Sequence, residues 1–133
     1  MRVVSLGDLV LDVVVRVRSD VARGADTPSH VALSAGGQGA NVAAWVAALG
    51  ASSRWIGKRA DDAAGRLAAE ALERVGVELA GPVEPDGNGV IVSLVEPGGE
   101  RSMFPDRGVA TLLEPVEVRP GWLVCVHLHG PGY

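Results

Sequence analysis

The chain has 133 residues, of which 47% are hydrophobic and 21% are charged. This composition is typical of one ordinary globular domain and excludes a disordered or collagen-like chain. The 12 Lys and Arg residues and 16 Asp and Glu residues give a net charge of −4, with the two signs interspersed. Because no basic stripe is available to neutralise phosphates, neither nucleic acid nor an acidic membrane surface is expected as a partner.

The sequence also argues against export and membrane insertion. Asp8 and Asp12 interrupt the apolar N-terminal stretch, and no small-residue cleavage site follows it. The longest near-apolar segment, residues 40–51, falls well short of the ~20 residues that span a bilayer. Cys125 lies alone in an apolar run, which favours a buried small hydrophobe over a nucleophile or half of a disulfide. We therefore expect a cytoplasmic protein.

The first half of the chain predicts strands followed by a helix. Residues 3–6 form a β-branched run typical of a buried central strand, and residues 11–18 alternate as expected for a strand with one wet face. Residues 30–34 are a third candidate strand. An apolar helix is predicted over residues 38–49, with Gly50 as its C-terminal stop.

The next segment continues the alternation of strands and helices. "SSRWIGK" is predicted to be a strand, and Asp61 or Asp62 caps a helix over residues 63–75. Trp45 and Trp55 are expected in the core, where the first helix packs on this strand. Within the second helix, side chains four positions apart are expected to form ion pairs: Arg66, Glu70 and Arg74. The order strand, helix, strand, helix favours a parallel sheet.

The segment "NGVIVSLVEPGGERSMFP" departs from this order. Two strand-like runs, residues 90–96 and 101–104, flank a Pro-Gly-Gly turn and predict a hairpin. Beyond it, "ATLLEP" suits one helical turn and "GWLVCVHLHG" a further buried strand. We expect an α/β domain in which the strands at 11–18, 30–34 and 90–104 form a small second sheet.

The stretch "AGGQGANVAAWVAALG" puts three glycines and Asn41 at the start of the first helix. Free N–H groups and the helix dipole favour electron-rich oxygen there, and the Asn41 amide suits a polyol better than a phosphate. No Walker loop occurs in the chain, and a dinucleotide fingerprint would need a third glycine directly after the first strand. A purely structural alternative is that the glycines allow close packing of helix on sheet.

Three ordered motifs resemble the ribokinase, or PfkB, family of carbohydrate kinases. They are "GDLVLDV", then "GGQGAN" with Gly50 and the later "ADDAAG", and finally "ERSMFPDRG". The resemblance extends over residues 3–133, essentially the whole chain. The chain departs from the family at Ala60, where the signature has glycine, and at Gln38, where ribokinases often have lysine.

The resemblance implies a ribokinase-like fold, with a Rossmann-like, mostly parallel sheet flanked by helices and a small β-sheet lid. A sugar would lie between the sheet and the lid, with ATP and Mg²⁺ used by the full-length protein. The implied sugar-binding residues are Asp12, Gly36, Gly37, Gln38, Asn41 and Arg107. Alternative roles remain for three of them: a turn acid for Asp12, a helix cap for Asn41 and a solvated hairpin-end cation for Arg107.

The family's catalytic Gly-x-Gly-Asp motif does not occur in this chain. We therefore interpret residues 1–133 as the N-terminal part of a single ribokinase-like domain, without a catalytic base or cofactor-binding residues, and expect it to be inactive alone. His127 and His129 alternate on a strand, but two histidines without a third ligand make a poor zinc site, so no metal is expected.

Two functions follow from this interpretation. The first is ATP-dependent phosphorylation of a sugar or sugar-like hydroxyl, possibly of a nucleoside, by the full-length protein. The second is a non-catalytic module that binds carbohydrate or dimerises, because an exposed lid edge can pair with a second lid. A small-molecule sugar is the expected partner in the first case, and a homodimer through the lid is plausible in both.

Overall fold

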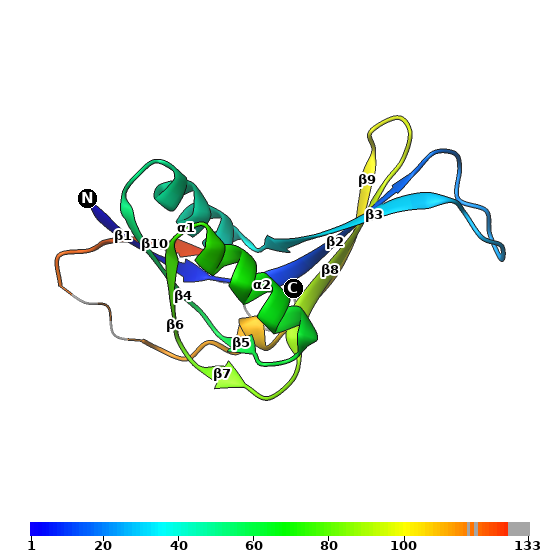
Figure 1. Cartoon of the computed structure of the whole chain (residues 1–133). Helices are drawn as coiled ribbons and strands as arrows, with labels where there is room; N and C mark the ends of the chain where they lie inside the picture. Colours follow the sequence, from blue (N-terminus) through cyan, green and yellow to red (C-terminus); the bar gives the residue numbers. More distant parts are fainter. Residues whose placement is uncertain (117, 119, 128–133) are drawn as a thin grey trace.

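The computed structural model describes residues 1–116, 118 and 120–127 (Figure 1). A main sheet of four parallel strands has the order β10-β1-β4-β6. Its strands are β1 (Arg2–Gly7), β4 (Ser52–Ile56), β6 (Val77–Ala80) and β10 (Leu123–His127). The strand predicted at residues 3–6 is therefore internal to the sheet, where its β-branched side chains are buried.

A second sheet has the order β3-β2-β8-β9 and extends away from the helices (Figure 1). Its strands are β2 (Val10–Val17), β3 (Ser29–Gly36), β8 (Asn88–Val95) and β9 (Arg101–Gly108). Strand β2 is antiparallel to β3 and parallel to β8, while β8 and β9 form an antiparallel hairpin. These strands include nearly all of the residues that the alternation pattern marked as extra strands.

Three short elements complete the architecture. Strands β5 (Arg59–Ala60) and β7 (Val83–Glu84) pair in parallel, and η1 (Val109–Leu112) is the single helical turn expected from "ATLLEP". Within the described residues, no helix combines the length and apolar character needed to cross a membrane.

The two helices are α1 (Gln38–Ala48) and α2 (Ala63–Arg74), within about one residue of their predicted ends. Gly50 follows α1 with φ of 84°, a conformation that favours glycine. Asp62, and not Asp61, caps α2. The expected ion pairs along α2 are wrong, since Arg66 contacts Asp61 instead, at 3.4 Å. Arg66 also donates to the carbonyl oxygen of Asp61, and these two contacts hold its side chain at the start of α2, away from Glu70.

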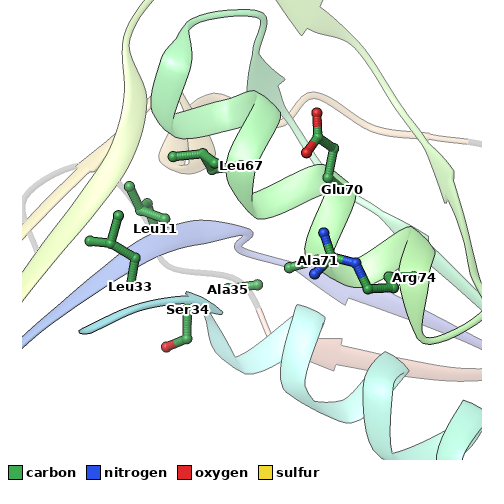
Figure 2. Close-up of a pocket in the computed structure, with 8 residues that line it drawn as sticks. All are labelled: Leu11, Leu33, Ser34, Ala35, Leu67, Glu70, Ala71 and Arg74. Carbon is green, nitrogen blue, oxygen red and sulfur yellow. The ribbon is translucent and has the colours of Figure 1, made fainter.

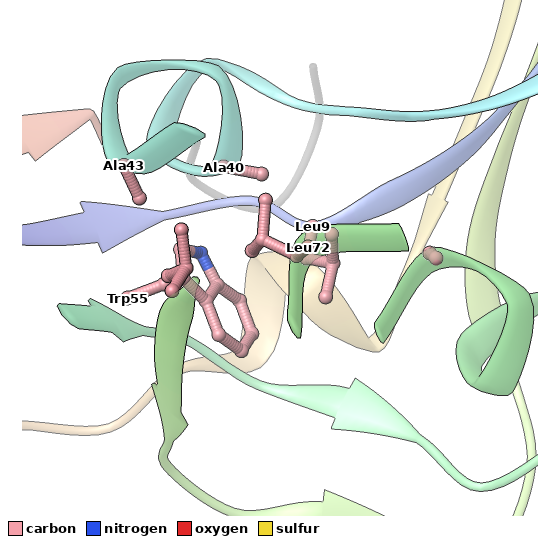
Figure 3. Packing of buried hydrophobic residues seen from close by; sticks show 7 residues of the cluster. Leu9, Ala40, Ala43, Trp55 and Leu72 are labelled. Atoms are coloured by element: carbon pink, nitrogen blue, oxygen red, sulfur yellow. The ribbon is translucent and has the colours of Figure 1, made fainter. Parts of the chain in front are cut away.

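Both helices share one apolar core with the main sheet (Figure 3). Trp55 on β4 is fully buried, and its Nε1 donates to the Gly7 carbonyl oxygen at 3.0 Å. Trp45 was expected beside it, but this prediction is wrong, because Trp45 is 70% exposed. Alanines at intervals of three and four residues occupy the packed face of α1, at positions 40, 43, 44 and 47. Trp45 lies on the opposite face of that helix.

Strand β10 lies at an edge of the main sheet, beside β1. Leu123, Val124 and Val126 are 58%, 44% and 55% exposed, so the expectation of a fully buried strand is wrong. Cys125 is half-buried for the same reason. The neighbouring His127 ends β10, and His129 lies outside the described residues.

Candidate functional site

A cavity of about 410 Å³ lies where the second sheet meets the start of α1. Its lining residues come from β2, β8, β9 and α1, and they are Asp12, Gly37, Gln38, Asn41, Ile91, Arg101, Met103 and Arg107. Five of the six sugar-binding residues expected from the sequence are among them. The volume lies in the range of small-molecule sites.

Asp12 is the carboxylate of this cavity. It lies on β2, opposite Ser34 of β3 and Ile91 of β8. Gly36, the sixth expected residue, packs directly beside it, because a Cβ at Gly36 would overlap the Asp12 carboxylate. Burial raises the pKa of Asp12, and the positive charge of Arg101 partly opposes this effect. A partly desolvated carboxylate gains from ligand groups that donate hydrogen bonds, as sugar hydroxyls do.

The glycines at the start of α1 serve close backbone packing. A Cβ at Gly39 would come within 2.7 Å of the Gly7 Cα, so only glycine lets α1 approach β1 this closely. Gly37 has φ of 98° and abuts the backbone of Asp8. The structural alternative therefore holds for both positions. Gly37 nevertheless lines the cavity as well, so the two roles coexist there.

Asn41 lies in the first turn of α1 and is exposed in the cavity. The capping position is occupied by Gly37, and no side chain hydrogen-bonds the helix start. The alternative that Asn41 is a helix cap is therefore wrong. Its amide, like that of the exposed Gln38 one turn earlier, faces the cavity with both donor and acceptor atoms.

Arg107 is fixed by a buried acid. Its Nη1 donates to Asp8 Oδ2 at 2.8 Å, and Asp8 is only 1% exposed. The alternative of a solvated hairpin-end cation is therefore wrong. Because Asp8 follows β1 and Arg107 lies near the end of β9, this ion pair joins the main sheet to the second sheet.

Three cavity residues were missed from the sequence: Ile91, Arg101 and Met103. The signal was present in β9, since residues two apart in a strand share a face and Arg107 had already been assigned to the site. Counting back from Arg107 in steps of two leads to Met103 and Arg101. Ile91 pairs with Pro105 of β9 and so belongs to the same face.

A smaller cavity, about 150 Å³, lies between α2 and the second sheet (Figure 2). Leu11 and Leu33 line it from the sheet, and Leu67 and Ala71 line it from the helix. Leu11 directly precedes Asp12 in β2 and therefore faces the opposite side of the sheet. Glu70 and Arg74 are its charged residues. The larger cavity is the better candidate site, because the smaller one falls below the usual volume of a small-molecule site.

Comparison with known proteins identifies the family. Residues 1–122 match the family model of the pfkB family carbohydrate kinases. The chain belongs to this family. As a pfkB family member, it is 37% identical over 121 residues to the ATP-dependent ribose-1-phosphate kinase of Halopiger xanaduensis. That match covers 89% of this chain and 41% of the relative.

Solved structures show the ribokinase-like fold of this pfkB family chain. It is similar to ribokinase from Arabidopsis thaliana complexed with ribose and ATP, with 30% identity and a TM-score of 0.70 over 83% of this chain and 36% of that one. It is also similar to ribokinase from Cryptococcus neoformans var. grubii in complex with ADP, with 28% identity and a TM-score of 0.75. That match covers 94% of this chain and 41% of the ribokinase. The chain thus spans about two fifths of the length of these relatives.

Because these relatives are ATP-dependent or were solved with ATP or ADP, we compared the described residues of this chain with what a nucleotide and a metal ion require. In the described part of the chain, no group of three or more His, Cys, Asp or Glu side chains is placed to hold a metal ion. The described lining of the larger cavity contains one carboxylate, Asp12, and the carboxylate of Asp8 is paired with the lining residue Arg107. No step involving Mg²⁺ or ATP is therefore assigned to these residues.

Proposed function

We propose that this chain carries the sugar-binding part of an ATP-dependent kinase that phosphorylates a hydroxyl of a sugar or a sugar-like compound such as a nucleoside. One observation carries this proposal. Asp12, Gly37, Gln38, Asn41 and Arg107 were expected from the sequence to bind a sugar, and all five line one cavity of about 410 Å³. Membership of the pfkB family supports the reaction class.

In this proposal the residues bind and orient the sugar. The Asp12 carboxylate accepts hydrogen bonds from two hydroxyls, and the Asn41 amide binds a neighbouring diol. Ile91 and Met103 supply apolar contact and reduce the water around the bound ring. The second sheet acts as a lid, because three of its four strands supply these side chains over the start of α1. Such positioning provides much of the catalysis in phosphoryl transfer.

We also propose that residues 1–133 are the N-terminal part of one ribokinase-like domain and are inactive alone. The chain lacks a Gly-x-Gly-Asp sequence and spans about two fifths of its relatives' length. ATP and Mg²⁺ then belong to the whole kinase, bound through residues that this chain does not supply. A cytoplasmic location accompanies this proposal, since the chain has a single cysteine and no means of forming an internal disulfide.

The first test is sugar binding by the chain itself. Asp12→Ala is expected to weaken ribose binding about 100-fold, because it leaves two sugar hydroxyls without their charged acceptor. Isothermal titration calorimetry measures the effect. Asp20→Ala is the matched control, since Asp20 is an exposed acid beyond the end of β2 and should leave the affinity within about 2-fold. Equal affinities for wild type and Asp12→Ala would contradict the proposed sugar site.

A non-catalytic role in carbohydrate binding or dimerisation is the second candidate, and the second sheet favours its dimeric form. Strands β3 and β9 are free edges. Leu33 and Phe104 are 56% and 60% exposed, and they lie in one row with Val13 and Val92 on the face opposite Asp12. Free edges beside an apolar face favour pairing with a second copy of the chain, so we propose a homodimer formed through the second sheets.

Substitution on the apolar row tests this dimer. Phe104→Asp is expected to raise the dimer dissociation constant at least about 10-fold, because it places a charge in an apolar contact. Sedimentation velocity over a range of protein concentrations measures the change. Leu49→Asp is the control, because Leu49 is 81% exposed but lies beyond the end of α1. A wild-type chain that stays monomeric at every concentration contradicts the dimer.

A further inference from the structure

The two arginines of the cavity are held differently. Both project from the same face of β9, six residues apart. Arg107 is tied to Asp8 at 2.8 Å. Arg101 forms no ion pair in the described part of the chain, although its positive charge acts on the Asp12 carboxylate. Arg101 is therefore the cation of this cavity that a ligand can recruit.

Strand register places Arg101 away from the hydroxyl-binding groups. Asp12 aligns with Ile91 and Pro105, whereas Arg101 aligns with Val95 and Arg16. The two rows are four residues apart, or about 13 Å along the strands. Because the Arg101 side chain is long, it still reaches the cavity wall, so the cavity combines a hydroxyl-binding part near α1 with a cationic part supplied by a residue farther along the second sheet.

A neutral sugar satisfies only the first of these parts. The five donors of a guanidinium match a phosphate or carboxylate in a two-point contact, which a hydroxyl cannot provide. A sugar with a phosphate on one carbon spans both parts, with its ring hydroxyls at Asp12 and Asn41 and its phosphate at Arg101. The Halopiger xanaduensis relative, 37% identical, is a kinase of ribose 1-phosphate, which has this combination of groups.

We propose that Arg101 is a specificity-determining residue that binds the phosphate of a sugar phosphate, so that the substrate class is a sugar that is already phosphorylated. This inference rests on the proposed function of the cavity as a sugar site. It assigns different roles to the two arginines: Arg107 keeps β9 against the main sheet, and Arg101 reads the anionic group of the substrate.

Calorimetric titration with ribose, ribose 1-phosphate and inorganic phosphate tests the proposal on the chain as it exists. Wild type is expected to bind ribose 1-phosphate about 10- to 100-fold more tightly than ribose, the range of a charge-assisted pair. Arg101→Gln should remove that gain and leave ribose affinity within about 2-fold. Arg101→Lys retains the positive charge but not the two-point hydrogen bonding of the guanidinium, so it should keep part of the preference for ribose 1-phosphate.

Arg18→Gln is the matched control, because it removes the same charge from the second sheet's end, outside the cavity and beyond β2. It should leave both affinities unchanged. Three results would overturn the inference: equal wild-type affinity for ribose and ribose 1-phosphate, an equal loss for both ligands in Arg101→Gln, or an equal loss in Arg18→Gln. If wild type binds neither ribose nor ribose 1-phosphate, the proposed sugar site itself is contradicted. If it binds both equally, only the phosphate-binding role of Arg101 is contradicted.

Discussion

Arg107→Met is expected to lower the free energy of unfolding by about 3 kcal/mol, a value typical of breaking a buried ion pair. The Arg107 side chain is 21% exposed and its partner Asp8 only 1%, so the variant takes a positive charge away from a carboxylate in a low-dielectric environment. Methionine keeps the apolar stem of the side chain and removes only the guanidinium. Urea unfolding followed by tryptophan fluorescence, to which the buried Trp55 contributes, measures the loss.

Two further variants separate the ion pair from a general effect of mutating β9. Arg101→Met removes the same group from the same face of β9 and should cost less than about 0.5 kcal/mol, because Arg101 is exposed. Asp8→Asn combined with Arg107→Met should recover part of the loss, since it also removes the buried negative charge. Equal destabilisation by Arg101→Met and Arg107→Met would contradict a special role for the pair.

The Asp8–Arg107 pair also explains how a projecting sheet can line a fixed cavity. The two residues are 99 positions apart in the sequence and join the end of β1 to the end of β9. Strand β9 is an edge strand, which main-chain bonds hold on one side alone. The buried pair anchors one end of this strand, so Met103 and Arg101 on the same strand keep their positions in the cavity wall.

Local patterns predicted most of the fold because they depend on near neighbours. The span of α1 followed from an apolar run that ends at Gly50, and the span of α2 followed from helical periodicity. The β8–β9 hairpin followed from its Pro-Gly-Gly turn. Trp45 was misplaced because residue type alone suggested burial. The packed face of α1 is instead built of alanines, whose small side chains let the helix lie close to the sheet beside Gly39 and Gly7.

The candidate site was predicted in part for a related reason. Asp12, Gly37 and Asn41 lie in short motifs that resemblance could identify, and the structure brings them to one cavity. The Asp8–Arg107 pair depends on a contact across nearly the whole chain, which no local pattern reveals. Arg101 could be predicted only once the limits of β9 were known, because strand alternation then places it on the same face as Arg107.

Asp62→Ala is expected to lower the free energy of unfolding by about 2 kcal/mol, at the upper end of helix-cap losses, because Asp62 does more than cap α2. Its carboxylate accepts backbone N–H bonds from Gly65 at 2.7 Å, Asn88 at 2.8 Å and Gly87 at 3.0 Å. The first bond caps the helix, and the other two tie the start of β8 to it. Thermal and urea unfolding measure the loss, and Asp61→Ala, at an exposed neighbouring acid, should cost less than about 0.5 kcal/mol.

The same contacts predict how stability depends on pH. Burial raises the pKa of Asp62, but the three N–H bonds, together with a side-chain hydrogen bond with Asp86, outweigh burial, so its pKa lies below the ordinary value of 3.8. A lowered pKa means that the unfolded chain binds this proton more readily than the folded chain. The stabilisation by Asp62 is therefore complete above about pH 5 and lost as the pH falls through the pKa of the folded protein. The Asp62→Asn variant should lose this part of the acid sensitivity, and an unchanged slope of stability against pH between pH 5 and 3 would show that another group causes it.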